Sequence, residues 1–229
     1  MPKSGKIFTL PQHLTLDEIH GSLDGFKITE PYESTEGPGF HIELIKDVTK
    51  LRAAPGGLEG IYAYDTVLQH KHRGRILHTP VTTETKFQIS DTPQMWLLCL
   101  APKHTANKVA IDLATILYGA DPEIRETSIW SRRIEEYLSE NDQAKVVLFD
   151  NLDIPGIDKD TLYGEELVQT DLFGRFKQSG TFRYIITKSR LTGYTVGIVS
   201  DGAVILFNTV EDDEYVSFVE DEIMPMVTF

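Results

Sequence analysis

The segment LQHKHRGRILH, residues 68–78, gathers the side chains of this chain that are best suited to bind an anion. It carries three cations and three histidines: Lys71, Arg73, Arg75, His70, His72 and His78. No aspartate or glutamate lies between Thr66 and Thr83. Guanidinium and ammonium groups bind phosphates through charge-assisted hydrogen bonds. The composition of this segment therefore predicts a binding site for an anionic partner such as nucleic acid.

The three histidines also offer a metal-binding alternative. His70 and His72 are two residues apart, so they share a face if the segment is a strand. If the chain turns back at Arg73-Gly74, His78 could lie near that face. Three imidazoles can bind Zn²⁺ and, with a carboxylate, could serve a hydrolase. The neighbouring cations would repel a metal ion, so we expect neither a metal nor any other cofactor.

A second segment without acidic residues runs from Leu172 to Ser200, and aromatic residues alternate with basic ones along it. On a strand, Phe182, Tyr184 and Ile186 would share one face. Basic and aromatic side chains together can hold nucleic acid, because charges contact phosphates while rings stack on bases. The predicted anion-binding or nucleic-acid-binding residues of this segment are Arg175, Lys177, Arg183, Tyr184, Lys188 and Arg190.

Strand patterns position both segments. Apolar and polar residues alternate along runs bounded by turn residues, which is typical of antiparallel hairpins. In the first half of the chain these runs are 60–70, 75–89 and 94–101, with Cys99 expected to be buried in the last. In the second half they are 166–178, 181–189, 193–200 and 203–208. The Asp201-Gly202 pair is a strong hairpin signal, because glycine adopts the positive φ that a tight turn requires.

Helix patterns close each series of strands. One amphipathic helix is expected at Thr105–Tyr118 and another at Glu211–Met224, each with apolar residues on one face. Two further helices are predicted over Ser128–Asn141 and after Thr15, whose capping-box spacing to Glu18 marks a helix start.

This order of elements predicts an α+β fold. We expect two antiparallel β-meander units, each closed by an amphipathic helix, over residues 1–119 and 120–229. The shared plan suggests a duplicated unit. The two units could form a single compact domain with one continuous sheet, or remain separate.

The charge of the chain is unevenly distributed. The 229 residues carry 22 Lys and Arg against 35 Asp and Glu, a net charge of −13. Residues 1–119 contribute −1 of this and residues 120–229 contribute −12. An acidic half can steer a basic partner into place. It therefore supports an alternative function as a protein–protein adaptor.

Several functional classes find no support in the sequence. It contains no P-loop, dinucleotide-binding, Gly-x-Ser-x-Gly or His-Glu-x-x-His pattern. No apolar run reaches the roughly 18 residues of a membrane span, and the N-terminus lacks a secretory apolar segment. With one cysteine, we expect an intracellular, cytoplasmic protein without membrane contact.

The leading functional hypothesis is therefore a non-catalytic binding protein for single- or double-stranded nucleic acid. An adaptor for a basic protein and a hydrolase with a histidine-based site remain the alternatives.

Overall fold

The computed structural model of the chain describes residues 1–11, 13–33, 41–120, 122 and 124–228. They form two compact units, and neither unit is contiguous in sequence. Unit 1 consists of Met1–Thr9, Leu100–His104 and Arg125–Phe229, and unit 2 consists of Leu10–Cys99 and Thr105–Ile124. Both contain antiparallel strands and helices, so the predicted α+β class is confirmed.

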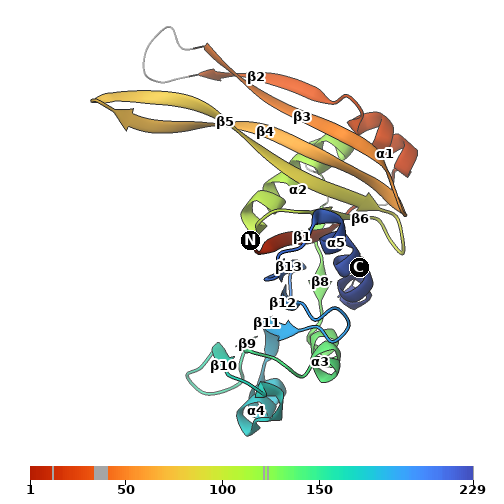
Figure 1. Cartoon of the computed structure of the whole chain (residues 1–229), viewed down its shortest axis with the longest axis vertical. Coiled ribbons are helices and arrows are strands. Elements are labelled where there is room, and N and C mark those ends of the chain that lie inside the picture. Colours follow the sequence, from red (N-terminus) through yellow and green to blue (C-terminus); the bar gives the residue numbers. More distant parts are fainter. Residues whose placement is uncertain (12, 34–40, 121, 123, 229) are drawn as a thin grey trace. The chain divides into compact units, whose positions relative to one another are not determined.

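The sheet of unit 2 is antiparallel, and its three middle strands are long (Figure 1). In spatial order they are β6 (Trp96–Cys99), β5 (Arg75–Ser90), β4 (Gly57–His72), β3 (His41–Ala54) and β2 (Lys27–Glu33). The predicted turn at Arg73-Gly74 joins β4 to β5. Both of its residues have positive φ, +47° and +80°, as a type I′ hairpin turn requires.

Helix α2 (Lys103–Tyr118) covers one face of this sheet at its base. Tyr62 on β4 donates a hydrogen bond of 3.1 Å to Asp112 of α2. The Lys108 ammonium lies 4.4 Å from the ring centre of Tyr64. The helix ends before Gly119, which has a φ of +84°, so the predicted closing helix of the first half is confirmed.

Helix α1 (Leu16–Leu23) packs against β3 and β4. The predicted capping box is present: Thr15 Oγ1 accepts a hydrogen bond from the Glu18 backbone N–H, and Glu18 accepts one from the Thr15 N–H. Cys99 is fully buried on β6, as predicted, and burial raises the pKa of its thiol.

The sheet of unit 1 has shorter strands. Their spatial order is β10 (Asp160–Tyr163), β9 (Val146–Asp150), β11 (Thr181–Lys188), β12 (Thr195–Val199), β13 (Ala203–Leu206) and β1 (Lys3–Thr9), with β7 (Arg125–Glu126) also pairing with β1. A separate antiparallel pair joins β8 (Ser128–Ile129) to β14 (Val227–Thr228). The Asp201-Gly202 hairpin is confirmed: β12 pairs antiparallel with β13 in the register Ile198↔Val204.

The helices of unit 1 are α3 (Ser131–Glu140), α4 (Asp171–Ser179) and α5 (Asp212–Phe218), with a 3₁₀ turn η1 at Leu167–Gln169. The expected helix at Glu211–Met224 is helical but not uniformly α. Its α-helical part starts at Asp212, which Glu211 caps, and continues as the π-helical turn η2 (Val219–Ile223) and the 3₁₀ turn η3 (Met224–Met226).

One predicted strand is wrong. Most of the run 166–178 folds as η1 and α4. Thr170 Oγ1 accepts a hydrogen bond from the Phe173 N–H and caps the helix. Phe173 and Phe176, three residues apart, then both point to the core, where each packs edge-on against Phe149 at ring-centre distances of 5.9 and 5.8 Å. The three-residue spacing of these phenylalanines buries both of them in a helix, whereas in a strand they would point to opposite faces.

None of the helices in the described part of the chain has the length and apolar character needed to span a bilayer.

Candidate nucleic-acid interface

The first basic segment forms the outer half of the β4–β5 hairpin. The two strands pair without a register shift from Gly57↔Ser90 to His72↔Arg75. Strand β3 accompanies β4 only as far as the pair Lys46↔Tyr64, and β6 accompanies β5 only at residues 87–90. Beyond Tyr64 the hairpin is therefore a two-stranded ribbon with no third strand paired to it among the described residues. We call residues 65–82 the ribbon (Figure 1).

The regular register assigns every ribbon side chain to one of two faces. His70 lies opposite Leu77, and His72 lies opposite Arg75, so these four share a face. His78 lies opposite Gln69 and therefore points to the other face. The three histidines are thus not brought together. No group of three potential metal ligands occurs among the described residues.

The cations at the tip of the ribbon are available to a ligand. Lys71, Arg73 and Arg75 are exposed, and His70 and His72 beside them are exposed as well. Within the described parts of the chain, no carboxylate lies within ion-pair distance of these three cations. A group of unneutralised cations creates a positive potential that attracts anions.

One face of the ribbon is partly covered by the neighbouring hairpin. The hydroxyl of Tyr32 on β2 lies 3.0 Å from Gln69 Nε2 and 3.3 Å from His78 Nδ1. Both contacts are on the face that also carries Lys71. The opposite face continues the surface that α2 covers at the base, but at the ribbon it is bare.

The second basic segment has a different structure from the one predicted. Arg175 and Lys177 lie on helix α4 rather than on a strand. Three of the cations are paired with carboxylates: Lys177 with Glu135 at 2.7 Å, Arg183 with Asp201 at 3.6 Å and Arg190 with Asp142 at 3.2 Å. Arg175 and Lys188 are exposed and have no such partner in the described part of the chain. This segment therefore keeps two of its five cations unpaired in the described part of the chain.

The expected alignment of aromatic residues on one strand face is also wrong. A bulge in β11, between Phe182 and Tyr184 where it pairs with β9, shifts the register by one residue. Phe182 consequently turns into the core against Phe149, with ring centres 4.9 Å apart. Tyr184 stays on the opposite face with Ile186.

Tyr184 lies against a glycine of the next strand. A Cβ atom at Gly197 would lie 2.8 Å from the Tyr184 hydroxyl, so only glycine leaves room for this ring. Burial, with a smaller contribution from Tyr163, raises the pKa of Tyr184. Tyr163 on β10 is 75% exposed on the same side of the sheet. The aromatic part of the prediction therefore reduces to a small surface around Tyr184.

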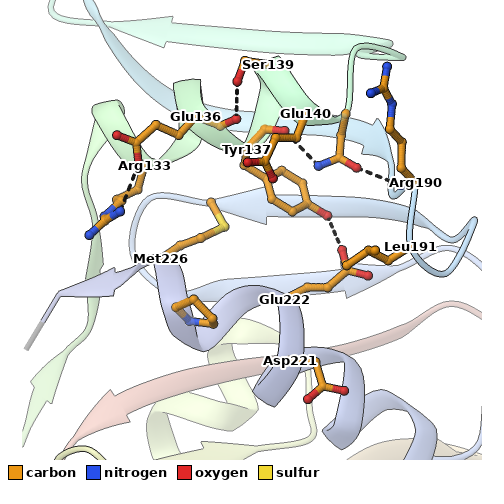
Figure 2. A pocket seen from close by; sticks show the side chains of 12 residues that line it. Arg133, Glu136, Tyr137, Ser139, Glu140, Arg190, Leu191, Asp221, Glu222 and Met226 are labelled. Atoms are coloured by element: carbon orange, nitrogen blue, oxygen red, sulfur yellow. Dashed lines mark hydrogen bonds and ion pairs between the residues drawn. The ribbon is translucent and has the colours of Figure 1, made fainter.

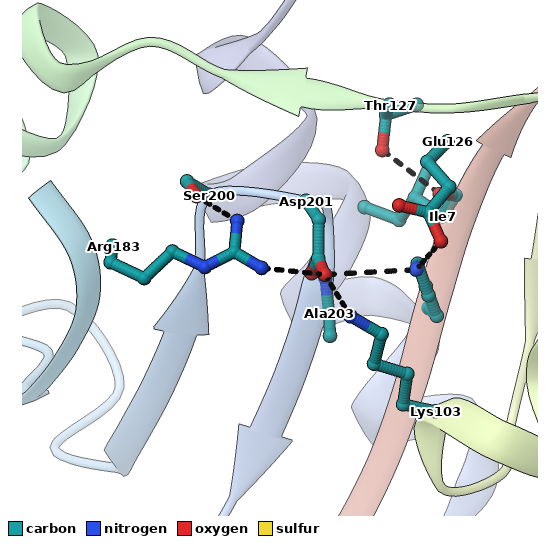
Figure 3. A network of polar contacts seen from close by, with 9 residues as sticks. Ile7, Lys103, Glu126, Thr127, Arg183, Ser200, Asp201 and Ala203 are labelled. Carbon is teal, nitrogen blue, oxygen red and sulfur yellow. Dashed lines mark hydrogen bonds and ion pairs between the residues drawn. The ribbon is translucent and has the colours of Figure 1, made fainter. Parts of the chain in front are cut away.

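Arg183 belongs to a network of charges around Asp201 (Figure 3). The Asp201 carboxylate also pairs with Lys103 and lies 3.8 Å from the ammonium of Lys6. Lys6 is fully buried and pairs with Glu126 at 2.5 Å. Burial acts to raise the pKa of Asp201, but the contacts with Lys103 and Lys6 outweigh it and hold that pKa below its usual range. This network joins β1, β7 and the β12–β13 turn, so its cations hold these elements together.

A cavity of about 580 Å³ lies beside α3 and the η2–η3 turns (Figure 2). Its wall includes Glu222, a buried carboxylate. Glu222 accepts hydrogen bonds from the hydroxyls of Tyr137 at 2.8 Å, Ser189 at 2.7 Å and Thr192 at 3.3 Å. No cation among the described residues lies within ion-pair distance of it. Burial and the Glu222 charge raise the pKa of Tyr137.

Further carboxylates line this cavity. Glu140 and Asp221 form no ion pair within the described residues, whereas both arginines of the wall are paired, Arg133 with Glu136 at 3.0 Å and Arg190 with Asp142. The cavity is therefore negatively charged. Sequence reasoning missed it, because its residues come from three distant segments and no local pattern marks Glu222.

Comparison with known proteins finds no protein-family model that matches the chain and no curated protein significantly similar to it.

Proposed function

We propose that this protein is a non-catalytic binding protein that engages nucleic acid through the ribbon. The observation that supports this proposal best is the presence, at the ribbon tip of a chain with a net charge of −13, of exposed cations that no carboxylate of the described residues neutralises. These exposed cations lie close together and repel one another weakly in water, and an anion that contacts them would remove this repulsion. A polyanion with regularly spaced phosphates matches an extended cationic arm.

The proposed function predicts a distinctive dependence on salt. Binding of cations to phosphates releases counterions, so the logarithm of the affinity should fall linearly with the logarithm of the salt concentration. Replacing Lys71, Arg73 and Arg75 with alanine should weaken binding and flatten this slope by roughly 0.7–0.9 for each phosphate that is no longer neutralised. The measurement is fluorescence anisotropy with a labelled oligonucleotide at several salt concentrations.

A matched control separates the ribbon from the overall charge of the chain. Lys46, Arg132 and Lys159 are also cations, but each is paired with a carboxylate. Their triple alanine variant carries the same net charge as the ribbon variant. It should retain most of the wild-type affinity. Equal losses in the two variants would contradict a specific role for the ribbon, and absence of wild-type binding at low salt would refute the proposed function.

A second candidate function is supported by the charged cavity. Its unpaired carboxylates, next to apolar walls such as Met226, suit the ammonium or guanidinium group of a basic partner protein. An oligolysine peptide should bind the wild type, and the Glu140→Gln/Asp221→Asn variant should bind it more weakly. The control is Asp17→Asn/Asp24→Asn, which removes equal charge from exposed positions of unit 2. Calorimetry in which both variants bind like the wild type would exclude this candidate.

A further inference from the structure

The bare face of the ribbon carries an apolar strip next to its charged end. Leu68 lies opposite Thr79, so Leu77 and Val81 are its two diagonal neighbours on the same face. Leu68 is 57% exposed and Val81 is 43% exposed. We call Leu77, Leu68 and Val81 the apolar strip. Towards the tip, His70, His72 and Arg75 continue the same face.

Exposed leucine and valine on a two-stranded ribbon are unfavourable in water, and the described residues provide no cover for them. The other face also carries apolar residues, Val67, Ile76 and Pro80, of which Ile76 is 44% exposed beside Lys71. That face, however, is partly occupied by Tyr32. Among the described residues, no such contact covers the face of the apolar strip, so this face is the more open one for a ligand that lies along the ribbon.

The dimensions of the ribbon suit one form of nucleic acid. Its unaccompanied pairs run from Asp65↔Thr82 to His72↔Arg75, a length of about 27 Å at about 3.4 Å per residue. The major groove of B-form DNA, about 12 Å wide, admits a two-stranded β-ribbon. The major groove of A-form RNA is too deep and narrow for side chains to read.

We propose that the ribbon lies in the major groove of double-stranded DNA with the apolar strip against the C5-methyl groups of thymines. This inference rests on the proposed function and adds the form of nucleic acid and the groove. Arg75, on the same face, is placed to donate hydrogen bonds to a guanine edge. Lys71 and Arg73, directed to the other face and the turn, contact the phosphates, which fix the position of the ribbon.

The thymine methyl group gives a direct test with the unaltered protein. A DNA duplex that contains deoxyuridine in place of thymidine keeps its base pairs, charge and form but lacks these methyl groups. Burial of one methyl contributes about 0.8 kcal/mol, which corresponds to about fourfold in affinity. The wild-type protein should therefore bind the thymidine duplex about fourfold more tightly for each methyl contacted, and should bind a double-stranded RNA of the same sequence more weakly still.

Two variants identify the face that is responsible. Leu68→Thr/Val81→Thr replaces the two most exposed residues of the apolar strip with β-branched residues suited to a strand. Because each threonine keeps only one methyl group, the variant should show a smaller difference between thymidine and deoxyuridine duplexes but keep the salt dependence of binding. Ile76→Thr, on the opposite face and equally exposed, should keep both. Circular dichroism of each variant establishes that the sheet is intact.

The outcomes separate this inference from the proposed function. If no nucleic acid binds at low salt, both fail, and a basic peptide ligand becomes the alternative. If nucleic acid binds but the two duplexes bind equally, or a single strand binds more tightly, the groove inference is overturned and the proposed function stands. If Ile76→Thr abolishes the methyl effect while Leu68→Thr/Val81→Thr does not, the assignment of the face is wrong.

Discussion

The two basic segments of this chain look alike in sequence but differ in how the fold uses their cations. On the ribbon, Lys71, Arg73 and Arg75 have no carboxylate partner in the described part of the chain. In unit 1, Lys177, Arg183 and Arg190 each pair with an acidic residue. A segment free of acidic residues is therefore not a free cationic surface. Whether its cations are free depends on which residues the fold brings beside them.

The contrast has a simple topological cause. The ribbon is no longer paired with β3 beyond Tyr64, and few of the residues that the structure describes approach its tip. The cations of unit 1 lie among helices and strands of the half of the chain that carries a charge of −12. Carboxylates from α3, the following loop and the β12–β13 turn reach them there. The charges that neighbour a residue in the sequence therefore say least about the charges around it in the fold where many elements pack together.

The largest effect that we predict from this contrast concerns stability. Lys6→Ala should lower the free energy of unfolding by about 2–5 kcal/mol, because it leaves a cavity in place of a fully buried side chain and removes the contacts of that side chain with Glu126 and Asp201. The triple alanine variant of the ribbon should unfold almost like the wild type in urea. If that variant proved as destabilising as Lys6→Ala, the ribbon cations would be structural and the contrast would disappear.

The pH dependence of stability should reflect the same network. The pKa of Asp201 is lowered in the folded protein, so its stabilising contribution is present above the unfolded carboxyl pKa of about 3.9. This contribution is lost as the pH falls through the lower folded value. Asp201→Asn should therefore be less stable than the wild type at neutral pH, and the difference should shrink in acid. A difference that is constant from pH 7 to pH 2 would show that the charge of Asp201 is not responsible.

A smaller effect should follow from releasing the neutralised cations. Glu135→Gln/Asp142→Asn frees Lys177 and Arg190. If pairing is what keeps them from anions, the affinity for nucleic acid should rise, and the salt slope should steepen by at most roughly 0.7–0.9 per freed cation. Glu165→Gln/Glu166→Gln changes the net charge equally, leaves the ion pairs of Lys177 and Arg190 in place and serves as control. If the affinity rose equally in both variants, the change in net charge would explain the effect and the ion pairs would not.

The smallest effect should come from the aromatic residue of the second segment. Tyr184 rests on Gly197, and only part of its ring is open to a ligand. Tyr184→Leu should therefore change the affinity for a single-stranded oligonucleotide by about twofold or less, well below the loss of about 1–3 kcal/mol per base expected for a stacking platform. A larger loss, measured by anisotropy, would restore the second segment as a binding surface.

Local signals in the sequence predict much of the fold. The Arg73-Gly74 and Asp201-Gly202 turns, the Thr15 capping box and the α2 stripe depend on residues close together in the chain, and all are present. Strand β1 has no such signal, because its partner β13 lies some 200 residues away. The helix α4 does have local signals, the Thr170 cap and the three-residue spacing of Phe173 and Phe176, which the strand prediction overlooked. The β11 bulge depends on the aromatic core, which no short window reveals.

The candidate site shows the same limit. The position and exposure of the ribbon cations follow from a two-residue turn and regular alternation, so the sequence is sufficient to locate them. The pairing of His78 with Gln69 also follows from that turn once the register is counted. The ion pairs of Lys177 and Arg190 could not be foreseen, because their partners come from elements packed alongside in space.

Pro80 gives the ribbon a safeguard against self-association. A two-stranded arm to which no third strand pairs in the described part of the chain offers two strand edges, onto which a second molecule could add its own strand. In an antiparallel hairpin, hydrogen-bonded and non-hydrogen-bonded residue pairs alternate from the turn onward. His72 and Arg75 form the hydrogen-bonded pair at the turn, and Val67↔Pro80 is the fifth pair after it, a non-hydrogen-bonded one. The backbone nitrogen of residue 80 therefore points away from β4, towards the open edge. Proline has no N–H to offer there. A second copy that added a strand along this edge would therefore lack one of the hydrogen bonds of the ladder.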